Sequence, residues 1–578
     1  MNALSKWCAV ALLAVPLAAQ DVLTQHNDNF RTGTNLHETR LTTANVKVAT
    51  FGKKWTLYTD GQVVAQPLYV SGLQRPGKPD VNAVVICTMH NTVYVYDADH
   101  ENPGPNGQNV PIWAKWLGPP RASDKQIDLW STNDPEWGIL STPVIDPTKK
   151  KLYVVNWSAD GTQWLHGFNL ADGSEPLPPT KIVATTTVGN EIIRFDPTLQ
   201  KQRPGLLLDG NLLYIAFGAS NEGQRKFHGW LLAYDVPSLT LRGVWCSTRT
   251  VGDQTDKGGI WQAGNGPSTD GNGNVFVITG DGGFNADVGG KSYGDSFVRL
   301  RLNGAGGFTV ASFFTPCNQE WLRRDDLDLD LGSSGPVVIP NTNLVVGGGK
   351  QGRLYLLDRT NMGGYRSPPT PGAKDCANPN AVQDFQATVG PQMHDGGLHG
   401  GHIHGSPVLW RDPNGNRHLF VWGEEDRLKS FPFNGSRFST TPSTMDWNLP
   451  RGMPGAMLSL SANGSTPGSA ILWCFATWER EPNVSKGWAD ANMARGVDGV
   501  LIATDASNID HKLWWSEQNA ARDHVGLFAK FCPPTIAGGK VFVATYGNVE
   551  PQRVYGGNDR PTQFPQHYYV AVYGLLNE

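Results

Sequence analysis

The sequence predicts an all-β fold, an eight-bladed β-propeller whose blades are four-stranded antiparallel sheets. A strand-opening motif recurs about every 65 residues, and an alternating strand that often ends in aspartate follows it in several units. The chain is rich in glycine and proline, with 67 and 40 residues, and contains no sustained run of helical apolar spacing. Short sheets without covering helices bury their faces by stacking on one another, and ring closure protects their edges.

The strand-opening motif is a residue followed by proline and then by an apolar strand. Its copies are Gln66-Pro67, Thr142-Pro143, Arg203-Pro204, Gly266-Pro267, Gly335-Pro336, Ser406-Pro407 and Cys532-Pro533. The first six prolines are separated by 76, 61, 63, 69 and 71 residues. The gap from Pro407 to Pro533 is about twice as long, and Leu458 to Asn463 places a similar strand in its middle. We therefore expect eight blades, or seven if the segment from Leu458 is an insertion.

The second repeated strand alternates in polarity and closes in aspartate. Examples are Val93 to Asp97, Leu231 to Asp235, Leu354 to Asp358 and Leu501 to Asp505. Turn sequences such as Asp209-Gly210-Asn211 separate the strands, as hairpins require. The last strand, Tyr568 to Tyr573, is expected to share a blade with Phe51 to Tyr58, which joins the two ends of one domain spanning residues 21–578.

The order of these signals, a proline-led strand, then a strand ending in aspartate, then a turn and in some units a tryptophan such as Trp245, resembles the PQQ-repeat propellers. This superfamily includes the quinoprotein alcohol dehydrogenases and non-enzymatic relatives such as outer-membrane assembly lipoproteins. The resemblance covers nearly all of residues 21–578. It implies the fold more specifically than the activity.

The first 20 residues resemble a secretory signal peptide. Lys6 precedes the apolar run Cys8 to Leu17, and Ala18 and Ala19 lead to a cleavage site after Gln20. No later segment reaches the apolar length of a membrane span. The net charge of -4 comes without a basic run, which argues against nucleic acid as a partner. We expect a secreted or periplasmic monomer.

Six cysteines remain after the signal peptide, and none are adjacent or spaced as CxxC. Cys87 and Cys474 lie in apolar strands and are expected to be buried free thiols. Cys317 and Cys376 lie in polar loops with prolines nearby, so we expect these two to pair if the protein is exported.

The densest group of possible metal ligands is His394, Asp395, His399, His402 and His404, which fall within eleven residues. Imidazole suits borderline metals, and His402 and His404 would point to the same side of a strand. The alternative is a loop in which these histidines bond main-chain carbonyls. Two further acidic groups, Glu424 to Asp426 and Asp270 to Asn274, are expected to be a solvated turn and a hairpin turn rather than metal sites.

The resemblance also implies a cofactor site at the mouth of the central funnel. Residues near the start of the innermost strands are its candidates, with Trp137 or Trp261 for stacking on a quinone and cations for its carboxylates. The complete set is Trp137, Arg203, Trp261, Gln262, Lys350 and Lys530. The vicinal cysteines of the dehydrogenases and a CxxCH haem motif are not present.

These observations favour an exported propeller that binds a small-molecule ligand or an extracytoplasmic protein partner at its funnel, with a metal at the histidine cluster as a further hypothesis. A first alternative is an oxidoreductase that acts on alcohols or sugars with PQQ and calcium, or with a transition metal. A second alternative is a scaffold for envelope assembly.

Overall fold

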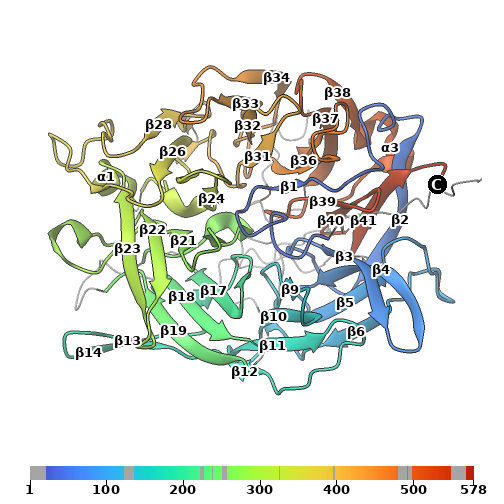
Figure 1. Cartoon of the computed structure of the whole chain (residues 1–578), viewed down its shortest axis with the longest axis horizontal. Coiled ribbons are helices and arrows are strands. Elements are labelled where there is room, and N and C mark those ends of the chain that lie inside the picture. The colour runs from blue at the N-terminus through green and yellow to red at the C-terminus, as the bar shows by residue number, and fades with distance from the viewer. Residues whose placement is uncertain are drawn as a thin grey trace, which may run out of the picture.

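The computed structural model describes residues 21–578 except 123–135, 222–226, 237, 250–256, 325, 395–396, 479–490, 492–496 and 548–567. Eight antiparallel sheets, each built on four strands, stand around one axis (Figure 1). The predicted eight-bladed propeller is confirmed. Seven blades are excluded because the strand that begins at Met457 is part of a blade of its own. The predicted signal peptide lies outside the described residues.

The first four blades lie between residues 68 and 315, and their strands run in sequence order from the axis outward. The first blade contains β3 (Leu68–Arg75), β4 (Lys78–Cys87), β5 (Thr92–Asp97) and β6 (Trp113–Trp116), and the second β9 (Val144–Asp146), β10 (Lys151–Trp157), β11 (Gln163–Asn169) and β12 (Thr180–Lys181). The third contains β16 (Leu207–Asp209), β17 (Leu212–Ala219), β18 (Trp230–Asp235) and β19 (Thr240–Cys246), and the fourth β20 (Ser268–Thr269), β21 (Val275–Ile278), β22 (Phe297–Leu302) and β23 (Phe308–Thr315).

The other four blades follow the same plan, and only the last departs from sequence order. The fifth contains β24 (Val337–Val338), β25 (Leu344–Gly348), β26 (Arg353–Asp358) and β28 (Gln383–Gln386), and the sixth β31 (Val408–Arg411), β32 (Arg417–Val421), β33 (Arg427–Phe433) and β34 (Ser443–Asn448). The seventh contains β35 (Met457–Ser461), β36 (Ile471–Trp478), β37 (Asp498–Asp505) and β38 (Lys512–Trp515), and the eighth β39 (Thr535–Ala537), β40 (Lys540–Ala544), β41 (Tyr568–Leu575) and β2 (Phe51–Thr59).

Short elements connect or extend the blades. The strands are β1 (Thr34–Asn35), β7 (Arg121–Ala122), β8 (Glu136–Trp137), β13 (Thr185–Val188), β14 (Glu191–Arg194), β15 (Gln200–Lys201), β27 (Gly364–Tyr365), β29 (Gln392–His394) and β30 (Gly397–His399). The helices are α1 (Gln319–Leu322) and α3 (Ala520–Asp523), with 3-10 turns at Gln262–Gly264, Ala286–Val288, Leu331–Ser333 and Ser516–Asn519. In the part of the chain that the structure describes, helix is thus confined to short turns, as the composition predicts.

The blades bury their apolar side chains against one another. Strand β17 is buried over almost its whole length because a neighbouring blade covers each of its faces. Tyr214 and Trp245 of the third blade, for example, share one apolar cluster with Val277 and Leu300 of the fourth. Flat aromatic and β-branched side chains suit such sheet-on-sheet contacts.

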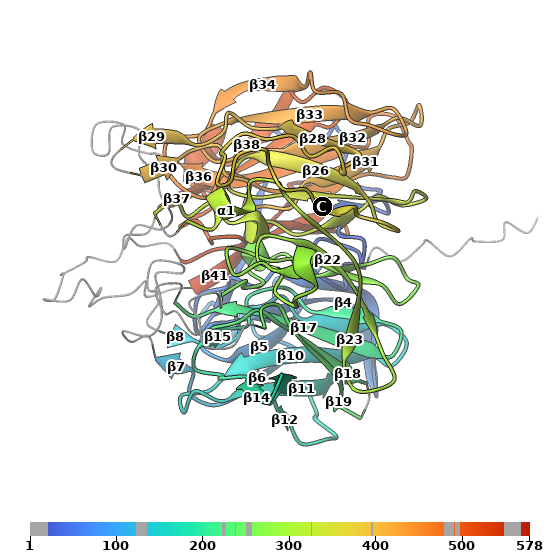
Figure 2. The same ribbon diagram turned by 90° about the vertical axis from the view of Figure 1, so that its left-hand side faces the viewer.

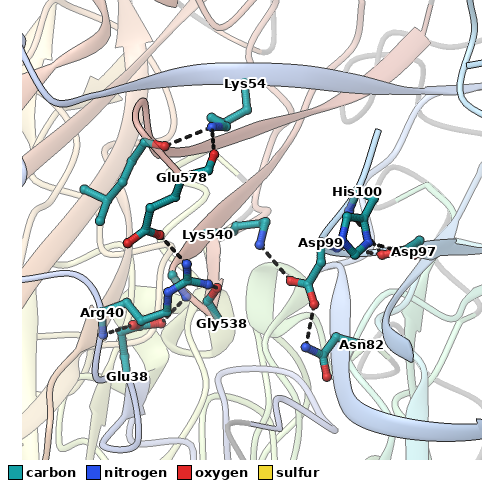
Figure 3. A network of polar contacts seen from close by, with 12 residues as sticks. Glu38, Arg40, Lys54, Asn82, Asp97, Asp99, His100, Gly538, Lys540 and Glu578 are labelled. Atoms are coloured by element: carbon teal, nitrogen blue, oxygen red, sulfur yellow. Dashed lines mark hydrogen bonds and ion pairs between the residues drawn. The ribbon is translucent and has the colours of Figure 1, made fainter. Parts of the chain in front are cut away.

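The ring is closed by a blade that combines both ends of the chain. Strand β2 pairs with β41, with Leu57 opposite Val570, which confirms the predicted closure. A polar network reinforces this junction (Figure 3). In it, Arg40 forms an ion pair with Glu578, and Lys540 of the closing blade reaches Asp99 of the first blade at 2.7 Å.

The cysteines behave as predicted. Cys317 and Cys376 form a disulfide, and the thiols of Cys87 and Cys474 are buried and free. The thiols of Cys246 and Cys532 are also buried and lie outside this disulfide.

Residues 22–35, the axial segment, run around the ring axis inside the innermost strands, where the blue chain crosses the centre of Figure 1. The segment hydrogen-bonds to every blade in turn. Its partners in the innermost strands or just before them are Tyr69, Ile145, Leu206, Thr269, Val338, Leu409, Leu460 and Ile536. Arg31, which is 0% exposed, donates to Pro267 O, Leu206 O, Gln25 O and Thr24 Oγ1. The centre of the ring is therefore filled by a hydrogen-bonded chain.

The innermost strands begin at one face of the ring, which we call the strand-start face. Strands β8, β15 and β29 mark this face, which lies to the left in Figure 2. The segments that precede the innermost strands converge here, so it collects side chains from all parts of the sequence.

Candidate functional site

Trp137, Trp261 and Lys201 form the first group of the site, at the strand-start face. The Lys201 Nζ lies 4.7 Å from the ring centre of Trp137 and 5.1 Å from that of Trp261. Each of the three residues precedes the innermost strand of its blade, and the three blades are neighbours. Residues 137, 201 and 261 therefore meet at the strand-start face. Lys201 was not among the residues that the sequence suggested, although it stands two positions before Arg203.

Arg203 and Lys530 form a second cationic group around the ring of Phe531. The Lys530 Nζ is 4.8 Å and the Arg203 Cζ 5.9 Å from the centre of that ring. Arg203 donates to the main-chain oxygens of Leu140 and Lys530, at 3.0 and 3.1 Å. Burial lowers the pKa of Arg203, and among the described residues the groups that raise it include no carboxylate. This part of the site therefore favours an anion.

His402, His404 and Glu424 form the third group, and all three are buried. The Glu424 Oε2 lies 3.1 Å from His402 Nδ1 and 3.4 Å from His404 Nε2. The His404 ring also faces Phe531, at 5.5 Å between ring centres, which places this group beside the cationic one.

The prediction of a solvated turn at Glu424 to Asp426 is wrong. Glu424 and Asp426 are 2% and 3% exposed, because the turn folds onto the neighbouring segment. The main chain of Glu424 donates to His402 O at 2.9 Å and accepts from Gly401 N at 2.6 Å. The prediction of a hairpin turn at Asp270 is confirmed, since Asp270 Oδ1 accepts from Asn272 N between β20 and β21.

The remaining histidines of the sequence cluster are placed elsewhere. His394 and His399 belong to the hairpin of β29 and β30, in which Gln392 pairs with His399. The group of converging ligand atoms found in the described residues contains His402, His404 and Glu424 and does not include His399. The side chain of His394 and all of Asp395 lie outside what the structure describes.

Burial sets the protonation states of the third group. It lowers the pKa of His404 to about 4, although Glu424 acts in the opposite direction. Burial alone would raise the pKa of Glu424, but the nearby rings of His402 and His404 bring it well below its usual range. At neutral pH this group therefore consists of a neutral His404 imidazole and an ionised carboxylate.

Lys350 belongs to a buried acidic group next to Trp261. Its ammonium lies 2.8 Å from Asp330, whose other oxygen accepts from the main chain of Asp281. Burial raises the pKa of Asp281 to about 7, and the neighbouring Asp330 adds to this effect, whereas Lys257 at 2.9 Å opposes it. Burial also raises the pKa of Asp295. Asp281 can therefore exchange a proton near neutral pH.

Gln262 stands on a strained turn between the first two groups. Gln262 and Ala263 have φ values of 49° and 42°, the left-handed region that side chains other than glycine rarely adopt. The Gln262 side chain is 0% exposed, and neither its amide nitrogen nor its amide oxygen has a hydrogen-bond partner. Strained backbone and unpaired buried amides are unfavourable unless another interaction compensates, and they concentrate at functional sites.

No protein-family model matches the chain, and no curated protein is significantly similar to it. Solved structures share its fold. A quinohemoprotein alcohol dehydrogenase from Pseudomonas putida HK5 aligns with a TM-score of 0.54 and 12% identity, over 96% of this chain and 80% of that chain. A europium-containing methanol dehydrogenase aligns with a TM-score of 0.54 and 13% identity, over 96% and 98%. At these identities the likeness establishes the fold alone.

The site thus combines ring faces, buried cations, a histidine–carboxylate group and a carboxyl group that titrates near neutrality. The predicted residues Trp137, Arg203, Trp261, Gln262, Lys350 and Lys530 are brought together at the strand-start face through the contacts above. Across the part of the chain that the structure describes, no helix has the length and apolar character of a membrane span.

Proposed function

We propose that the strand-start face binds a small, planar, anionic ligand, and that the protein is an exported ligand-binding propeller. The observation that carries this proposal is the Lys201 ammonium over the rings of both Trp137 and Trp261. Indole faces bind a flat ring by stacking, and a cation among them attracts a carboxylate.

Arg203 and Lys530 support the same ligand class. Both side chains are almost fully buried, at 5% and 2% exposure. A buried cation is costly unless an anion accompanies it, and no carboxylate among the described residues raises the pKa of Arg203, so a ligand with a negative group suits this position. The unpaired amide of Gln262 is then available to donate to a ligand oxygen and to accept from a ligand N–H or O–H.

A quinone-dependent oxidoreductase is the second candidate. PQQ is planar and carries carboxylates, so Trp261, Lys201 and Arg203 suit its ring and charge. When bound, it would supply two-electron oxidation of an alcohol or sugar. Asp281 favours this candidate because its pKa of about 7 lets it accept a proton at neutral pH. The fold likeness to quinoprotein dehydrogenases also supports it, whereas the lack of adjacent cysteines in the sequence weighs against it.

The test is titration of the purified protein with PQQ, followed by tryptophan fluorescence and by absorbance. We expect saturable quenching in the wild type and at least about tenfold weaker binding in Lys201→Met, because one charge-assisted contact is lost. Trp261→Leu should weaken binding similarly. Trp116→Leu is the matched control, since Trp116 is 55% exposed and lies at the outer edge of the first blade.

The proposal fails if PQQ and other planar carboxylates do not bind, or if Lys201→Met binds as tightly as the wild type. Dye reduction with a panel of alcohols and sugars separates the two candidates. Binding without dye reduction supports the ligand-binding propeller, and reduction that is lost in Asp281→Asn supports the oxidoreductase.

A further inference from the structure

We propose that His402, His404 and Glu424 form a three-ligand site for a divalent transition metal ion, with open positions for water or a small ligand. One ligand atom from each of these residues lies within 4.8 Å of the other two. The proposal concerns residues other than Lys201, Trp137 and Trp261, and it does not depend on the anionic ligand proposed above.

The first argument is the state of the His402 ring. The residue is 4% exposed, and neither Nδ1 nor Nε2 has a hydrogen-bond partner. The Nδ1 is 3.1 Å from Glu424 Oε2, but the geometry is not that of a hydrogen bond. A buried imidazole without a hydrogen bond is unfavourable, and an ion bound between the two atoms would compensate for it.

The second argument is the spacing of the ligand atoms. Zinc-type ions bind imidazole nitrogen and carboxylate oxygen at about 2.0–2.2 Å, so neighbouring ligand atoms of a tetrahedral site are separated by about 3.3 Å. The carboxylate oxygen of Glu424 lies 3.1 Å from one imidazole nitrogen and 3.4 Å from the other. Both separations are close to this value, and the two imidazole nitrogens lie within 4.8 Å of each other.

The third argument is that the main chain fixes the ligands before any ion binds. Glu424 N donates to His402 O, which holds the carboxylate opposite the first imidazole. His404 O accepts from Asn265 Nδ2 at 3.1 Å, and Ile403 O accepts from Ser333 Oγ at 2.7 Å. Three blades therefore hold the segment that carries the histidines. Because this segment is already ordered, little conformational entropy is lost when an ion binds.

The ligand set selects the class of ion. Two imidazoles and one carboxylate suit borderline ions such as Zn²⁺, Co²⁺ or Fe²⁺, whereas Ca²⁺ requires six to eight oxygen ligands. Structural zinc sites have four protein ligands, and catalytic sites have three. Among the described residues three side chains converge here, which favours the open type.

A second histidine provides the contrast. His524 contacts two carboxylates, but it does so through different ring nitrogens, with Nδ1 3.0 Å from Glu517 and Nε2 3.5 Å from Asp498. Its ligand atoms do not converge on one point, and the ring behaves as a bridge between two acidic groups. His524→Ala is therefore the control for loss of a histidine–carboxylate contact, although this ring is only partly buried.

The experiment uses the full chain, purified without chelator and analysed for metals by mass spectrometry. The protein is then stripped with a chelator and titrated with Co²⁺. We expect about one ion per chain and visible d–d absorption of a four- or five-coordinate site in the wild type. His402→Ala/His404→Ala should lose the band, Glu424→Gln should bind Co²⁺ at least about tenfold more weakly, and His524→Ala should match the wild type.

The proposal is overturned if stripped wild type gives no Co²⁺ band, or if the double variant and Glu424→Gln retain it unchanged. Because the double variant can fail to fold, circular dichroism accompanies each titration, and Glu424→Gln, a variant of equal size, decides the outcome in that case. Lys201→Met should bind Co²⁺ like the wild type. This comparison separates failure of the metal site from failure of the anionic-ligand site.

Discussion

Two arginines buried near the axis, Arg31 and Arg203, lie in different environments. Arg31 of the axial segment makes four hydrogen bonds to oxygen atoms that surround its guanidinium. Arg203 at the strand-start face makes two to main-chain oxygens and otherwise faces the ring of Phe531. The same side chain therefore makes four hydrogen bonds in the centre of the ring and two at the strand-start face.

This difference separates a structural region from a binding region. Saturated buried donors stabilise the fold, and they offer nothing to a ligand. The unpaired atoms of Gln262 and His402 and the partly coordinated Arg203 all lie at the strand-start face. Unpaired buried atoms also occur elsewhere, for example in the side chain of Asn27 of the axial segment, so the strand-start face is distinguished by unpaired groups that lie close to buried cations.

The largest expected effect is on stability, from Arg31→Met. The substitution leaves Pro267 O and Gln25 O without this donor, whereas Leu206 O keeps the hydrogen bond from Thr24 Oγ1, and each unsatisfied buried acceptor costs about 1–3 kcal/mol. We expect the free energy of unfolding to fall by about 4 kcal/mol in urea denaturation. A fall below about 1 kcal/mol would mean that the axial segment contributes little.

Arg203→Met should affect binding rather than folding. We expect about 50-fold weaker binding of PQQ, the size of one lost charge-assisted contact, and a smaller loss of stability than in Arg31→Met. Fluorescence titration and urea denaturation of the same two variants measure both quantities. Equal loss of stability in the two variants would remove the distinction between the regions.

The axial segment should also make the protein sensitive to acid. Burial lowers the pKa of His26 to about 4, so its neutral form is favoured in the folded state, and stability is lost as pH falls from 6.5 toward 4. This residue alone should reduce the free energy of unfolding by about 2 kcal/mol between pH 7 and pH 5. His26→Gln should narrow that difference, and an unchanged difference would assign the acid sensitivity to other groups.

The smallest expected effect is a pH dependence at the strand-start face. Asp281 faces Asp330, Lys257 and Lys350, and its pKa of about 7 means that it becomes ionised between pH 6 and pH 8. The new negative charge should weaken binding of an anionic ligand about fivefold, the size of a solvent-screened interaction of ~1 kcal/mol. PQQ titrations at both pH values should show this change in the wild type and not in Asp281→Asn.

The fold could be predicted from the sequence because the strand pattern that produces each blade is repeated along the chain. Each proline-led strand precedes the same alternating partner, and a single unit such as that at Leu458 is recognised by its position between Pro407 and Pro533. The Cys317–Cys376 disulfide was predictable for a different reason, since both cysteines lie outside apolar strands.

Several residues of the candidate site could be selected from the sequence because they stand close to a proline step. His402, His404 and Arg203 meet that condition. Glu424 follows the second strand of its blade, and its burial depends on main-chain pairing with Gly401 and His402 that no local pattern specifies. Lys201 looks like an ordinary surface lysine in the sequence. Its place in the candidate site depends on contacts with Trp137 and Trp261, which are distant in sequence.

The axial segment also determines how cooperatively the protein unfolds. In most repeat proteins each unit contacts only its neighbours, so units can unfold one after another. Here residues 22–35 contact all eight blades, and removal of one blade breaks a contact shared with the other seven. The ring should therefore unfold as a single cooperative unit. During synthesis this segment emerges early, but it finds its last partner, Ile536, only when nearly the whole chain has been made.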